Sequence, residues 1–187
     1  METSPYCTIG PFFPGAFVTG CEDLTSFQGK PARGQHIILT GCVFEDGHRP
    51  ILNSIVEIWQ ADANGVLRHP LDPRFHEADP GFFGWGRART DADGRYSFRT
   101  VMPGGGARCP HVNLMILAIG LTRRLVTTVF FAETSNSVRD PVVDCVTDPA
   151  VRERMLARRE KDGNGVLPVY RYDIVTRGES ETPFFID

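Results

Sequence analysis

Apolar and polar residues alternate along several short segments of the chain, as in β-strands that bury one face. In residues 95–101, for example, Tyr96, Phe98 and Thr100 fall on one side. Comparable segments rich in Val, Ile, Phe and Thr predict strands over residues 36–44, 54–60, 94–101, 111–119, 125–131 and 170–176. Gly, Asp and Pro turns separate them. The succession predicts an all-β fold, an antiparallel β-sandwich.

One short helix interrupts this pattern, and we expect it near residues 148–160. Asp148 can cap its start, Pro149 suits the first turn, and Gly163 can end it. Apolar residues recur between these positions at helical spacing.

The first 34 residues differ in composition, with four prolines and five glycines. They predict an irregular N-terminal arm, followed by a single β-sandwich domain over residues 35–187. The apolar cluster at residues 9–17 is too hydrophobic for a solvated tail, so it should pack on this chain or on a partner.

Length and charge narrow the class of protein. A chain of 187 residues suits one domain, and a net charge of -3 gives no electrostatic case for binding nucleic acid or a membrane surface. The five cysteines form no Cys-x-x-Cys pair and are expected to be reduced thiols. Neither a signal peptide nor an apolar run of membrane-spanning length is evident, so we expect a cytoplasmic protein.

Residues 84–113 have the layout of a metal-site scaffold. Because side chains two apart on a strand point to the same side, His111 and Asn113 should lie side by side, where a His-x-His pair could chelate a metal. The amide oxygen of Asn113 replaces imidazole poorly on a transition metal.

The other candidate groups have plain structural interpretations. Lone histidines are commonly structural, and the aspartates sit where turns favour them: Asp62, Asp72, Asp79, Asp91 and Asp93. Glu57 is either a buried functional carboxylate or a salt-bridged strand residue. No nucleophile elbow, phosphate loop or dinucleotide fingerprint is present. These patterns do not by themselves identify a reaction.

Longer motifs carry a resemblance. The string Ser-Ile-Val-Glu-Ile-Trp-Gln-Ala-Asp-Ala-Asn-Gly at residues 54–65, the Gly-Pro-Phe-Phe of residues 10–13 and the Pro-His-Val-Asn of residues 110–113 resemble the intradiol ring-cleavage dioxygenases. Within that family, the chain is most similar to the α subunits of protocatechuate 3,4-dioxygenases. The resemblance covers nearly the whole chain and implies an intradiol dioxygenase-like sandwich.

The resemblance also implies a ligand set that this chain lacks. Family enzymes hold Fe(III) with two tyrosinates and two histidines and cleave a catechol with O2. The first tyrosine position is Leu67, the second falls in residues 105–106, and the histidine positions are His111 and Asn113. Three of four ligands are therefore replaced, and we expect Leu67, His111 and Asn113 to be vestigial ligand positions with no metal in this chain.

The resemblance implies a partner as well. The leading hypothesis is an α-type subunit whose arm, through Thr8, Gly10, Pro11 and Phe12, lines the protocatechuate pocket of a homologous, Fe(III)-bearing β chain. A pocket arginine of the family appears here as Thr128. Two alternatives remain: a non-catalytic transthyretin-like binding or structural module, and an active intradiol enzyme with unusual ligands.

Overall fold

The computed structural model describes residues 13–106, 108–135, 140–160 and 167–185, and in residues 134–135 only the backbone. The described strands are β1 (Ser26–Phe27), β2 (Lys30–Pro31), β3 (His36–Glu45), β4 (Arg49–Pro50), β5 (Ile55–Gln60), β6 (Trp85–Arg89), β7 (Arg95–Val101), β8 (His111–Leu117), β9 (Leu125–Phe131), β10 (Leu156–Arg159), β11 (Val169–Arg171) and β12 (Ile174–Val175). The helices are η1 (Gly15–Phe17), η2 (Asp46–His48), η3 (Phe75–Glu77), α1 (Ala132–Ser135), α2 (Pro141–Cys145) and α3 (Pro149–Glu153). The all-β prediction is confirmed.

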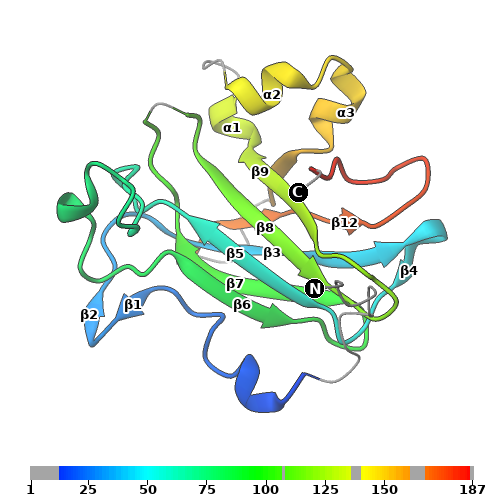
Figure 1. The fold of residues 1–187 in the computed structure, drawn as a ribbon, viewed down its shortest axis with the longest axis horizontal. Helices are drawn as coiled ribbons and strands as arrows, with labels where there is room; N and C mark the ends of the chain where they lie inside the picture. The colour runs from blue at the N-terminus through cyan, green and yellow to red at the C-terminus, as the bar shows by residue number, and fades with distance from the viewer. Residues whose placement is uncertain (1–12, 107, 136–139, 161–166, 186–187) are drawn as a thin grey trace, which may run out of the picture.

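Ten of these strands form one curled sheet in the order β12-β3-β11-β10-β9-β8-β5-β6, with β4 and β7 also paired to β3. Figure 1 shows β5 and β8 crossing in front of β3. The core lies between these layers and includes Leu39 of β3, Ile58 of β5, Phe98 of β7 and Leu114 of β8. Alternation along β7 and β8 supplies their inward side chains, whereas β5 is buried along most of its length.

The sheet is mixed, so the expectation of a purely antiparallel sandwich is wrong in this respect. β9 pairs with β10 in parallel, and β3 pairs in parallel with both β11 and β12. The predicted strand over residues 170–176 is divided into β11 and β12. Both pair with β3, but residues 172–173 between them belong to neither strand.

The predicted helix near 148–160 is shorter than expected. Asp148 caps it by accepting a 2.8 Å hydrogen bond from the Ala150 N–H, as predicted, and Pro149 begins it. The chain then leaves the helix, because Met155 and Ala157 are fully buried and Ala157 pairs with Phe131 as part of β10. The stop predicted at residue 163 lies outside the described residues.

The segment 21–24 joins the edges of β6 and β7. The Cys21 carbonyl accepts from the Arg87 N–H at 2.9 Å, and the Arg99 N–H donates to the Glu22 carbonyl at 2.9 Å. Leu24 is buried in the core, as is Ala32. The later part of the expected arm therefore packs on this chain, whereas the boundary at residue 34 stays a prediction.

No helix among the described residues is long and apolar enough to cross a membrane. Four cysteines fall in the described part of the chain, and no disulfide joins any two of them: Cys21, Cys42, Cys109 and Cys145.

Candidate functional site

A cavity of about 850 Å³ opens beside the start of β8, and three of the predicted ligand positions border it. Leu67, Gly106 and His111 all line it, although they are far apart in the sequence. Trp59 and Arg108 contribute further lining. The fold therefore brings three of the four expected ligand positions to one cavity, whereas Asn113 is not among its lining residues.

The loop that carries Leu67 is held by two aspartates. The Asp62 carboxylate accepts backbone hydrogen bonds from Asn64 at 2.9 Å and Val66 at 3.0 Å. The Asp72 carboxylate accepts from the Leu67 N–H at 2.9 Å, and hydrogen bonding lowers the pKa of Asp72. These carboxylates organise the cavity wall, as the turn interpretation predicts.

Glycines allow the loop after β7 to approach the Leu67 loop. Gly65 has a φ of 75°, and a Cβ there would lie 2.7 Å from the Gly105 carbonyl oxygen. A Cβ on Gly104 would lie 2.4 Å from the Ala63 oxygen. Since both contacts are with backbone, only glycine fits at these positions.

His111 is held as a neutral hydrogen-bonding group. Its Nδ1–H donates to the Cys109 carbonyl at 2.8 Å, which leaves Nε2 to accept from an Arg108 N–H at 3.3 Å. Burial lowers the pKa of His111, and the nearby Arg108 charge adds to this effect, although the bond to Cys109 opposes it. The imidazole is therefore uncharged at neutral pH.

Behind Arg108 lies Asp140, whose carboxylate is fully buried. It accepts from the Arg108 Nε at 3.2 Å and Nη2 at 3.0 Å, and from the Cys109 N–H at 3.0 Å. It also caps α2 through the Val142 N–H at 3.0 Å. Burial raises the pKa of Asp140, but these hydrogen bonds outweigh it and hold the pKa below its usual value.

Asn113 follows His111 on the same side of β8, as predicted from the period of two. Its Oδ1 accepts from the Thr128 hydroxyl of β9 at 2.8 Å. The amide oxygen thus has a partner within the sheet. Thr128 is 5% exposed and satisfies this amide, so it does not extend into solvent.

These groups do not fit the iron that the fold family implies. Leu67 offers only carbon, residues 105–106 are glycines, and the remaining imidazole nitrogen faces a guanidinium. Fe(III) favours hard anionic oxygen, which this donor set lacks. Across the described residues, no three His, Cys, Asp or Glu side chains gather in a group that could hold a metal ion.

Glu57 proves to be a salt-bridged strand residue. Its carboxylate accepts a 2.6 Å hydrogen bond from Arg87 Nε on β6, and both side chains are largely buried. Two other aspartates stabilise the turns predicted for them. The Asp79 carboxylate accepts from the Gly81 N–H at 2.9 Å, and the Asp91 carboxylate accepts from the Arg95 N–H at 2.9 Å.

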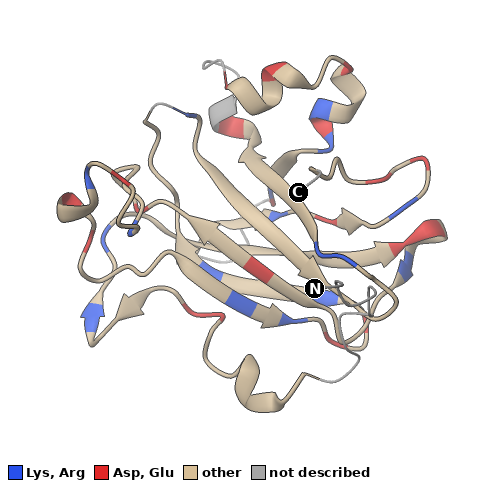
Figure 2. Cartoon of the chain, in the orientation of Figure 1, with Lys and Arg blue, Asp and Glu red and all other residues tan. Residues whose placement is uncertain are grey.

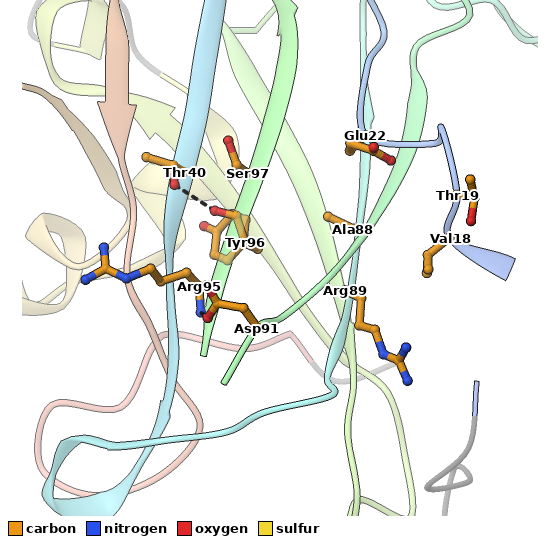
Figure 3. Close-up of a pocket in the computed structure, with 10 residues that line it drawn as sticks. All are labelled: Val18, Thr19, Glu22, Thr40, Ala88, Arg89, Asp91, Arg95, Tyr96 and Ser97. Atoms are coloured by element: carbon orange, nitrogen blue, oxygen red, sulfur yellow. Dashed lines mark hydrogen bonds between the residues drawn. The ribbon is translucent and has the colours of Figure 1, made fainter. Parts of the chain in front are cut away.

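A second hollow of about 610 Å³ lies between the segment 18–22 and strands β6 and β7. Figure 3 shows the guanidinium groups of Arg89 and Arg95 pointing to opposite sides of it. The Thr40 hydroxyl is committed to the Tyr96 carbonyl at 2.7 Å. Its polar groups do not converge, so it is a weaker site candidate than the first cavity.

Charge is scattered over the fold, and β8 and β9 carry no Lys, Arg, Asp or Glu (Figure 2). The predicted arm residues lie outside the described part of the chain: Thr8, Gly10, Pro11 and Phe12. Sequence reasoning missed Arg108, which lines the cavity, and Asp140, which pairs with it. The only available signal was the position of Arg108 three residues before His111.

Comparisons with known proteins agree with this geometry. Residues 9–178 match the family model described as Dioxygenase. The chain is 33% identical to a protocatechuate 3,4-dioxygenase alpha chain of Pseudomonas putida, over 99% of this chain and 94% of that one. It is 36% identical to a protocatechuate 3,4-dioxygenase beta chain of Burkholderia cepacia, over 89% of this chain and 78% of that one.

A solved structure shares the fold. The 3-chlorocatechol 1,2-dioxygenase of Rhodococcus opacus 1CP superposes with a TM-score of 0.63 at 21% identity, covering 93% of this chain and 69% of that one. The family match spans most of the sequence, and two of the motifs that carry it, residues 54–65 and 110–113, contribute to the cavity lining. The chain belongs to the intradiol ring-cleavage dioxygenase family.

Proposed function

We propose that this chain is an α-type subunit of a protocatechuate 3,4-dioxygenase-like complex, in which Fe(III) is held by a homologous β chain. The observation that carries the proposal is the cavity lining: Leu67 and Gly106 border it at positions where a family enzyme has tyrosine ligands. Asn113, two residues beyond His111, takes the place of the second histidine. The match to an alpha chain over 99% of this chain supports it.

The beta chain of Burkholderia cepacia is the more identical relative at 36%, so overall identity does not distinguish the two roles. The donor set does. A catalytic chain needs anionic oxygen ligands for Fe(III), and Leu67 cannot supply one. The proposed role is therefore non-catalytic in this chain and catalytic in the complex.

The N-terminal arm is the proposed contribution to the partner's substrate pocket, through Thr8, Gly10, Pro11 and Phe12. Its apolar character continues into the described residues, where Phe13 and Phe17 stack with ring centroids 5.6 Å apart. A cytoplasmic location, which the free thiols favour, is part of the same proposal.

Co-expression with a β-type chain that has both tyrosines and the His-x-His pair tests the proposal. We expect the two chains to co-purify and to cleave protocatechuate, with the tyrosinate-to-iron visible absorption lost when the β chain's tyrosines are replaced. This chain alone should show neither the absorption nor activity.

Two outcomes would contradict the proposal. If this chain, purified alone, shows the absorption and cleaves protocatechuate, it is itself an iron enzyme. If the chains do not associate and no activity arises, the transthyretin-like binding module becomes the better description.

A further inference from the structure

The cavity beside Leu67 has the dimensions and lining of a small-molecule site. Its volume of about 850 Å³ is within the range of ligand pockets, roughly 300–1,000 Å³. Trp59 and Leu67 form apolar wall, and Leu71, which is 86% exposed, lies at the same cavity. A flat apolar body would gain most from this lining.

Arg108 supplies a cation with donors to spare. A guanidinium has five N–H groups, and the described residues take three: Asp140 takes two and His111 takes one. The Arg108 side chain is 33% exposed and lines the cavity. An anion in the cavity could therefore receive the remaining donors.

Asp140 does not compete for that role. Its side chain is fully buried and accepts four hydrogen bonds, two from Arg108 and one each from the Cys109 and Val142 N–H groups. Asp140 fixes the Arg108 guanidinium in position, so less conformational entropy of this side chain is lost when a ligand binds.

The remaining charges at the cavity favour an anion as well. Arg74 lines it and donates to the Gly65 carbonyl at 2.6 Å. Asp72 is the acid among the described lining residues, and its oxygens accept the N–H groups of Leu67 and Arg74. The cavity is thus lined by two guanidinium groups, those of Arg108 and Arg74, and by one carboxylate, Asp72, whose oxygens already accept backbone hydrogen bonds.

We propose that this cavity binds a planar aromatic monocarboxylate without a metal ion, with its ring against Trp59 and Leu67 and its carboxylate on Arg108. A guanidinium fork matches a carboxylate with two parallel charge-assisted hydrogen bonds. The inference goes beyond the subunit role and does not depend on it.

Calorimetric titration of the full chain, purified without a partner and kept in EDTA, tests the site with benzoate as the probe. Benzamide has the same shape without the charge. We expect saturable binding of benzoate at least about tenfold tighter than that of benzamide. Equal affinities, or no saturable binding of benzoate, would overturn the proposal.

Two variants localise the binding. Leu67→Trp places an indole where the ligand's ring is proposed to lie and leaves the Arg108–Asp140 pair intact, so it should weaken benzoate binding at least about tenfold while the protein stays folded. Arg108→Gln combined with Asp140→Asn removes the cation without leaving a buried unpaired charge, and should reduce the preference over benzamide to nearly nothing.

Arg99→Gln is the matched control, because Arg99 is an exposed arginine of β7 paired with Asp23 and is not part of the cavity. It should bind benzoate as the unmodified chain does. If Leu67→Trp retains full affinity, the site lies elsewhere and the proposal is wrong. Failure of the subunit role would show in co-purification, so the two proposals can fail separately.

Discussion

Arg87 lies between two aromatic rings and a buried carboxylate. Its guanidinium carbon is 3.5 Å from the Phe17 ring centroid and 4.9 Å from that of Trp85. Its Nη1 donates to the Phe17 carbonyl at 3.0 Å, and its Nε donates to Glu57. One side chain therefore connects β5 and β6 to the apolar segment that enters the fold from the N-terminus.

Replacing Glu57 with Gln should destabilise the chain by about 3–5 kcal/mol, because Arg87 becomes a largely buried cation without a counter-charge. The double variant Glu57→Leu with Arg87→Met should lose less than the single variant. Urea unfolding at neutral pH measures both. A Glu57→Gln variant as stable as the unmodified chain would show that solvent compensates Arg87.

Asp140→Asn should lower the free energy of unfolding by on the order of 2–3 kcal/mol, a reduced figure because Arg108 is partly exposed. The folded pKa of Asp140 lies below its unfolded value of about 4. Its stabilising contribution is therefore fully present above about pH 5 and is lost as the pH falls through the folded pKa.

Urea unfolding of the unmodified chain and of Asp140→Asn, measured from pH 7 down to acidic pH, tests this pH dependence. The stability difference should be constant near neutral pH and shrink as the pH falls. A difference that stays constant, or grows, in acid would assign the effect of the substitution to lost packing or capping and not to the ionised carboxylate.

At the level of elements, sequence predicted the strands that alternate and missed those fixed by distant contacts. The bounds of β9 match the expected 125–131, because β-branched and aromatic residues follow one another there without a break, and its last five residues are buried. β6 was missed because its sequence contains Gly86 and two arginines. β10 was missed because its pairing with β9 is parallel and leaves only four residues to show a period.

Gly86 has a physical reason that its own sequence neighbours do not show. A Cβ there would lie 2.5 Å from Leu24 Cδ1 and 2.8 Å from the Cys21 carbonyl oxygen. Gly86→Ala should therefore push the segment 21–24 away from β6, at a cost of about 1–3 kcal/mol.

Urea unfolding with limited proteolysis checks this effect. Cleavage before residue 24 should become faster in Gly86→Ala. Gly15→Ala is the control, because nothing lies within 4 Å of a Cβ at Gly15. Equal stability and equal cleavage rates of the two variants would mean that the segment 21–24 moves away from β6 without a loss of stability.

For the molecule as a whole, the site was only partly predictable. The period of two placed His111 beside Asn113, and the resemblance indicated Leu67. The cavity itself is assembled from the loop after β5, the loop after β7 and the start of β8, so its existence depends on the complete fold. Asp140 lies 32 residues from Arg108, and no local pattern links them.

The proposed complex makes the N-terminus a part of the chain that catalysis needs and folding does not. The described core is built from residues at and beyond Leu24, so deletion of residues 1–14 should leave the unfolding midpoint of this chain nearly unchanged. In the complex with a β chain, the same deletion should raise KM for protocatechuate and lower kcat, because the arm would no longer line the partner's pocket.

Steady-state kinetics of the complexes with the full-length and the truncated chain, at equal iron content, measure this, and a Thr19→Ala complex serves as the control outside the deleted segment. Full activity of the truncated complex would refute the pocket role of the arm while leaving the pairing of the two chains intact.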